Sequence, residues 1–130
     1  MIFTPKGFLL VGGVVLVLVG ILGFVGVIGP TAEKSIFGAR WYFDNAENWA
    51  HLVIGIVGLI AVYTIGMSAQ RGLVMLLGVI GILVAVYNLF GTTFLGANLE
   101  RPLDLLLHLV IGVWALMASK KSEPSMTTTI

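Results

Sequence analysis

Apolar residues in this chain form four long runs, separated by short stretches that hold nearly all of the charged residues. A helix needs about 20 residues to cross the hydrocarbon core of a bilayer, and each run is close to that length. The runs cover about residues 7–28, 46–67, 72–90 and 102–119. Backbone amides inside a bilayer must be paired within their own segment, so the pattern predicts four transmembrane α-helices. We expect Gly29-Pro30 to end the first helix, Gly91 to break the third and Pro102 to open the fourth.

Composition excludes several classes of protein. The chain has 130 residues, 58% of them hydrophobic and 10% charged, which is too few polar residues to cover a soluble domain. The first run is longer than a signal-peptide core and no small-x-small cleavage site follows, so we expect it to stay in the membrane. A net charge of +1 and seven scattered basic residues argue against nucleic-acid binding. The chain has no cysteine, which excludes disulfides, thiolate metal sites and cysteine nucleophiles.

Basic residues in the short connections bear on orientation. An even number of spans puts both termini on one side, with Lys6, Arg71, Lys120 and Lys121. Lys34, Arg40 and Arg101 fall on the other side. This bias of four against three predicts cytoplasmic termini for a multi-pass protein of the plasma membrane.

The chain also repeats itself. The segment from His51 to Gly55, His-Leu-Val-Ile-Gly, recurs without change from His108 to Gly112, 57 residues later. Four residues before each histidine stands an acid, Glu47 in one copy and Asp104 in the other. A shift of 58 residues aligns further pairs: Gly20 with Gly78, Gly23 with Gly81, and Gly38-Ala39 with Gly96-Ala97. Agreement at three places indicates an internal duplication.

The duplication predicts an all-α integral membrane fold: a four-helix transmembrane bundle made of two parallel-repeat helical hairpins. The transmembrane domain covers residues 1–119, with repeat one at about 7–67 and repeat two at about 72–119, and a polar tail covers 120–130. Repeats of two spans insert with the same orientation, related by a pseudo-two-fold axis along the membrane normal. We therefore expect His51 and His108 at one depth, near the side that carries most of the acids.

Small residues are expected at the helix contacts, because helices in lipid associate by close backbone approach. The candidates for packing are Gly20, Gly23, Gly55, Gly78, Gly81 and Gly112.

The motifs Asp44-Asn45 … His51-Leu52-Val53-Ile54-Gly55 and Asp104 … His108-Leu109-Val110-Ile111-Gly112 resemble those of a family of small four-span bacterial membrane proteins. That family is a domain of unknown function with Asp/Asn-x-x-x-His-Leu-x-x-Gly segments in helices two and four. The resemblance covers about residues 7–118. It implies a bacterial inner-membrane protein and no known reaction, so no residue is carried over as catalytic.

Polar residues inside a membrane are the candidates for chemistry. Glu47 and Asp104 suit the positive ends of the helices that they open, while His51 and His108 hydrogen-bond within the bundle. Alternatively, the two histidines bind haem axially, or one of them binds a chlorin, with the acids as hydrogen-bonding partners of the imidazoles. A metal site is disfavoured because the acids have the simpler role, and no relay of polar groups crosses the midplane.

The sequence shows no hydrolase elbow, phosphate-binding loop or metalloprotease helix, so no catalytic residue and no enzyme activity are expected. The aromatic, basic segment 35–43 is expected to form an interfacial belt or a docking surface. We predict a structural or accessory membrane protein, packing as a homo-oligomer or as a subunit of a larger complex, with no cofactor. The alternatives are a haem- or chlorin-binding protein and an oligomeric channel or small transporter.

Overall fold

The computed structural model describes residues 1–121 and consists mainly of four helices. They are α1 (Pro5–Phe24), α2 (Asn45–Thr64), α3 (Met67–Asn88) and α4 (Leu103–Lys120). Each is long and apolar enough to cross a membrane, so the prediction of four span-length helices is confirmed. Most of the predicted polar tail, residues 122–130, lies outside the described residues.

The first helix ends earlier than predicted, at Phe24 rather than near residue 28. Gly26 takes a φ of +87°, a left-handed conformation that glycine adopts without steric cost. The amides of Val27 and Ile28 then donate to the Leu22 carbonyl, at 3.1 and 3.2 Å. Glycine just past the last turn is a common helix stop, and here it acts before Gly29-Pro30 is reached.

The third helix begins five residues before the predicted start, so that only Ile65 and Gly66 join α2 to α3. The buried Gln70 makes this short turn possible. Its side-chain amide donates to the Val62 carbonyl at 3.2 Å and to the Ile65 carbonyl at 3.0 Å. Those carbonyls close α2 and have no partner within the helix. The polar residues of this segment, which predicted a loop, therefore belong to the first turn of α3. From there Gln70 stabilises the connection to α2.

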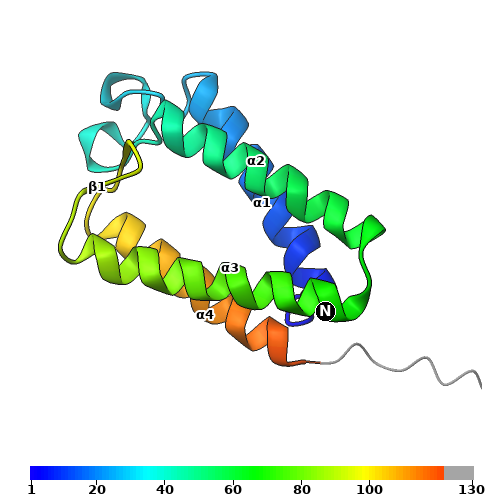
Figure 1. The fold of residues 1–130 in the computed structure, drawn as a ribbon. Helices are drawn as coiled ribbons and strands as arrows, with labels where there is room; N and C mark the ends of the chain where they lie inside the picture. Colours follow the sequence, from blue (N-terminus) through cyan, green and yellow to red (C-terminus); the bar gives the residue numbers. More distant parts are fainter. Residues whose placement is uncertain (122–130) are drawn as a thin grey trace, which may run out of the picture.

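The helices pair as two hairpins, α1 with α2 and α3 with α4 (Figure 1). The hairpins contact each other mainly where α1 meets α3 and α4. A cluster of buried apolar side chains fills this contact near the chain's first residues, at the end where α2 turns into α3. Its members are Phe8, Leu9, Ala61, Val62, Val74, Ala115 and Ala118. The opposite end, the loop end, carries segments 25–44 and 89–102.

Within each hairpin the helix backbones approach closely at glycines. A Cβ atom on Gly55 would lie 2.8 Å from the Gly13 carbonyl oxygen and 2.9 Å from the Val17 nitrogen. A Cβ atom on Gly112 would lie 3.0 Å from the Gly78 carbonyl oxygen and 2.9 Å from the Ile82 nitrogen. By these contacts Gly78 takes the place of Gly13, whereas the sequence alignment pairs Gly78 with Gly20. The loop between α1 and α2 is longer than the loop between α3 and α4, which displaces the register.

The other candidate packing glycines are also buried at helix contacts. A Cβ on Gly20 would lie 2.9 Å from the Asn48 carbonyl oxygen, and one on Gly23 would overlap the Asn48 side chain. A Cβ on Gly81 would lie 3.1 Å from the Gly112 Cα atom. All of them therefore sit where a side chain would separate two helices.

The loop end has its own short elements. The first loop holds two 3₁₀ turns, η1 (Ala32–Lys34) and η2 (Gly38–Arg40). The second loop holds an antiparallel ribbon of β1 (Thr93–Phe94) and β2 (Ala97–Asn98). Gly38 and Gly96, which open the two Gly-Ala pairs, both have positive φ, +62° and +84°. Each loop thus turns at a glycine in the left-handed region.

Replacement of Gly55 by alanine tests the packing within a hairpin. Overlap with backbone atoms of α1 costs about 1–3 kcal/mol, more than the roughly 1 kcal/mol that alanine gains as a helix former. Thermal unfolding in detergent should therefore show that Gly55→Ala lowers stability. The control is Gly72→Ala in α3, where a Cβ would meet nothing within 4 Å. Equal stability of the two variants would contradict the packing described here.

Candidate functional site

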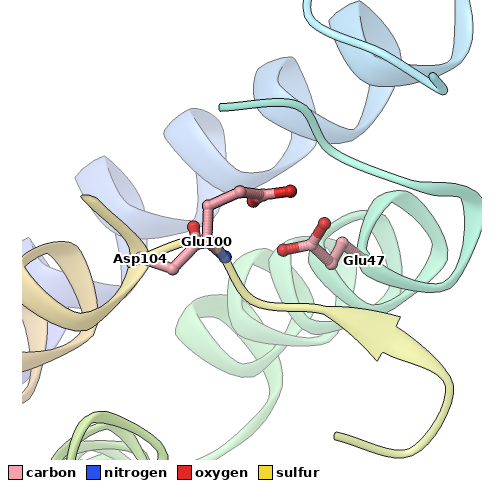
Figure 2. A group of neighbouring side chains, drawn as sticks. All are labelled: Glu47, Glu100 and Asp104. Carbon is pink, nitrogen blue, oxygen red and sulfur yellow. Dashed lines mark hydrogen bonds between the residues drawn. The ribbon is translucent and has the colours of Figure 1, made fainter. Parts of the chain in front are cut away.

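Three carboxyl groups meet at the loop end, brought together from both hairpins (Figure 2). One oxygen from each of Glu47, Glu100 and Asp104 lies within 4.8 Å of the others. Glu47 belongs to the first turn of α2 and Asp104 to the first turn of α4. Glu100 lies in the segment between β2 and α4. The fold therefore places the two predicted helix-start acids side by side and adds a third.

Glu47 is fixed by the start of its own helix. Its backbone amide donates to Asp44 Oδ1 at 2.9 Å, and its Oε2 accepts from the Asp44 amide at 3.0 Å. This reciprocal pair is a capping box, which satisfies two amides that the helix leaves without a partner. Glu47 is only 4% exposed, so the carboxyl group is held beneath the loops rather than in solvent.

Asp104 is the centre of the cluster. It is completely buried, and both of its oxygens accept hydrogen bonds. Oδ1 accepts from the Trp41 indole nitrogen at 2.8 Å, and Oδ2 accepts from the Glu100 amide at 2.7 Å. Trp41 comes from the loop of the first hairpin, so this carboxylate joins the two hairpins.

A second hydrogen bond joins the hairpins, with its donor in the second hairpin and its acceptor in the first. The backbone amide of Asn98, in β2, donates to Asp44 Oδ2 at 2.6 Å. The Asn98 side-chain amide also donates to Glu100 Oε1. Asp44 therefore caps α2 with one oxygen and holds the second loop with the other.

Glu100 is half-buried, and its Oε2 has no hydrogen-bond partner in the described part of the chain. Burial, followed by the neighbouring Asp104 carboxylate, raises the pKa of Glu100 from 4.5 to about 8. Both causes favour the neutral form of the carboxyl group. At neutral pH Glu100 therefore keeps its proton for most of the time, which lowers the repulsion within the cluster.

The histidines occupy equivalent helices but different surroundings. Nδ1 of His108 lies 2.7 Å from the backbone carbonyl of Asp104, not from its carboxylate. The ring of His51 packs edge-on against Phe43, with centroids 5.6 Å apart, and its Nδ1 is buried without a partner among residues 1–121. The carboxylates of Glu47 and Asp104 bind amides and an indole. Within residues 1–121, therefore, neither carboxylate forms the hydrogen bond to an imidazole that was considered from the sequence.

Two asparagines support the loops from inside the bundle. Asn48 is fully buried and donates from Nδ2 to the Phe43 carbonyl at 3.0 Å. Asn88 donates to the carbonyls of Gly91 at 3.0 Å and Leu99 at 3.4 Å. These bonds fix the chain on either side of the carboxyl cluster.

Sequence reasoning missed Trp41 and Glu100. Trp41 lies in the segment that the sequence predicts to be an interfacial belt or a docking surface, but its indole nitrogen donates to a carboxylate 63 positions away. Glu100 stands four residues before Asp104, a spacing that could have drawn attention to it. Its place beside Glu47, in contrast, depends on how the two hairpins meet.

The cluster combines oxygen ligands of the kind that Ca²⁺ and Mg²⁺ take. However, both Asp104 oxygens and one oxygen each of Glu47 and Glu100 already accept hydrogen bonds from the chain. This arrangement favours a structural tie between the hairpins. No protein-family model, curated protein or solved structure matches the chain.

Substitution of Asp104 by asparagine tests the tie. Asparagine keeps one acceptor but turns an NH₂ group toward either Trp41 or the Glu100 amide, which leaves buried donors facing each other. An unsatisfied buried donor costs about 1–3 kcal/mol, so we expect Asp104→Asn to lower stability by that amount in detergent unfolding. In the double variant with Trp41→Phe, the loss of stability should be smaller than the sum of the losses in the two single variants. Glu33→Gln, at an exposed acid, is the control, and strict additivity would show that Trp41 and Asp104 do not interact.

Proposed function

We propose that the chain is a structural or accessory protein of a bacterial inner membrane, which acts by packing against other membrane helices. The packing unit is a homo-oligomer or a larger complex. The observation that carries this proposal is that α2 makes few contacts with elements other than α1. Among the described elements, α2 packs extensively against α1 only, and it leaves an apolar stripe of Val53, Val57 and Ile60 more than half exposed. Helices in lipid gain little from apolar contact alone, so such a stripe faces either lipid or a helix that fits it.

The polar groups support the same proposal. The carboxyl groups at the loop end accept hydrogen bonds from backbone amides and from an indole. These bonds favour a structural role for the acids over a catalytic one. An accessory protein needs a fixed outer surface, and the hydrogen bonds between the hairpins hold that surface in one arrangement.

Membrane orientation and internal symmetry are part of the proposal. The excess of Lys and Arg beside the termini favours a cytoplasmic position for both. We further propose that the hairpins are parallel repeats, supported by the matching contacts of Gly55 and Gly112 and by the positive φ of Gly38 and Gly96. In this scheme the chain belongs with the small four-span bacterial proteins whose repeated histidine segments it resembles.

Single cysteines test the packing surface, because the natural chain contains none. With Val57→Cys we expect a thiol-reactive crosslinker to produce adducts in native membranes, of twice the chain mass for a homo-oligomer and of other masses for a complex. The control is Leu83→Cys on α3, where the side chain is 60% exposed compared with 52% for Val57. If Val57→Cys stays monomeric, or reacts no better than Leu83→Cys, packing through α2 is ruled out.

A second candidate function rests on His51. Its Nδ1 is buried without a partner in the described chain, and an imidazole nitrogen in that state is able to ligate a haem or chlorin. Protein purified from its native membrane would then show a Soret or chlorin absorption band. His51→Ala should abolish the band, and Trp49→Phe, at an exposed residue two positions away, should keep it. A spectrum without such a band removes this candidate and leaves the packing proposal untouched.

A further inference from the structure

The turn of the β1–β2 ribbon has an unfavourable residue at its tip. Leu95 and Gly96 join Phe94 to Ala97, and both take positive φ, +50° and +84°. Two-residue hairpin turns with positive φ at both positions favour Asn or Asp at the first position and glycine at the second. Leu95 is the one non-glycine residue with positive φ within residues 1–121. For a residue with a Cβ atom this conformation lowers the folded-to-unfolded ratio roughly 5- to 30-fold.

Contacts within the described chain do little to offset this cost. Leu95 is 89% exposed, and a Cβ atom on the neighbouring Gly96 would meet nothing within 4 Å. Phe90, at the start of the same loop, is 85% exposed. A strained backbone that carries an apolar side chain away from its own protein is a reason to look for a partner outside the chain.

Hydrogen bonds hold the ribbon at the level where the helices end. Tyr87, in the last turn of α3, donates from its hydroxyl to the Thr93 carbonyl at 2.5 Å, and its ring packs against Phe94 with centroids 5.4 Å apart. On the other strand, the amide of Asn98 donates to Asp44, the N-cap of α2. Both strands are therefore fastened to the end of a membrane-length helix.

The lengths of the helix and the ribbon set the depth of the turn. The 22 residues of α3, at about 1.5 Å each, extend roughly 33 Å, close to the ~30 Å of a hydrocarbon core. The end of α3 therefore lies near the boundary of the core. Strands of two residues reach only about 7 Å from that level, and the head-group layer is about 5–8 Å thick on each side. The ribbon is too short to carry Leu95 far beyond the head groups.

We propose that the β1–β2 ribbon inserts the Leu95 side chain into the lipid interface and so anchors the second loop to the bilayer. Removal of a leucine side chain from water favours the buried state by roughly 10- to 150-fold, which matches or exceeds the cost of the strain. Tyr87, exposed beside the ribbon, fits this depth, because tyrosine and tryptophan gather where hydrocarbon meets head groups. The inference rests on the membrane location proposed above.

Nitroxide labels on single cysteines test the depth of the turn in vesicles of phosphatidylethanolamine and phosphatidylglycerol. Oxygen collects in the hydrocarbon, whereas a nickel chelate stays in water, so the ratio of the two collision rates reports depth. The reference positions are Leu83 in α3 and the exposed acid Glu33. For Leu95→Cys we expect an oxygen-to-nickel ratio several times that of Glu33→Cys and below that of Leu83→Cys.

The reference positions separate failure of this inference from failure of the membrane location. A ratio at Leu95→Cys as low as that at Glu33→Cys, with a high ratio at Leu83→Cys, would overturn the insertion and leave the spans in place. A low ratio at Leu83→Cys as well would overturn the membrane location and the insertion together. A Leu95→Cys label shielded from both reagents would show that protein covers the turn, which contradicts insertion into lipid.

A second comparison keeps the label away from Leu95, since a nitroxide is itself apolar. The label is attached at Thr92→Cys, an exposed position of the same loop. Adding Leu95→Asn should raise nickel access to this label severalfold, whereas Leu95→Met, which stays apolar, should change it little. Asparagine suits a turn position with positive φ, so the ribbon keeps its turn and the change reports lost insertion. Equal nickel access in the two double variants would contradict the anchoring role of Leu95.

Discussion

The hydrogen bond from the Trp41 indole to Asp104 is the interaction on which the loop end depends. A carboxylate removed from water is costly unless donors replace the water, and Asp104 is completely buried. One donor comes from the first hairpin and one from the second, so the carboxylate is satisfied only when the hairpins meet in this arrangement. The position of Trp41 depends in turn on Ser35, whose hydroxyl donates to the Trp41 carbonyl at 2.7 Å. The first loop is therefore folded around a side chain of the second hairpin.

Packing inside the hairpins and packing between them have different physical origins. Within a hairpin, glycine allows the two backbones to touch, as at Gly55 against Gly13 and Gly112 against Gly78. Between the hairpins the contacts lie at the two ends, with the buried apolar cluster near the α2–α3 turn and the carboxyl network at the loops. A bilayer offers little apolar driving force between helices, so polar bonds at one end and close side-chain fit at the other must hold the hairpins together.

The sequence predicted what depends on local pattern and missed what depends on distant partners. Four spans follow from four apolar runs, and the two acids at the helix starts follow from their place before those runs. The predicted end of α1 and the predicted start of α3 are wrong by several residues, because Gly26 stops α1 early and Gln70 supports a turn of only two residues. Trp41 and Glu100 could not be assigned to the cluster, since each reaches it through contacts between segments far apart in the chain. The alignment of Gly20 with Gly78 is likewise displaced because a longer first loop changes which glycine faces Gly55.

A net charge near zero conceals how the charges are distributed. At the loop end, Asp44 and Asp104 accept hydrogen bonds from donors that the chain itself provides, namely two backbone amides and an indole. At the other end lie the starts of α1 and α3, together with Lys6, Arg71, Lys120 and Lys121. The described chain therefore separates much of its charge, with every described acid at the loop end and four of the seven basic residues at the opposite end.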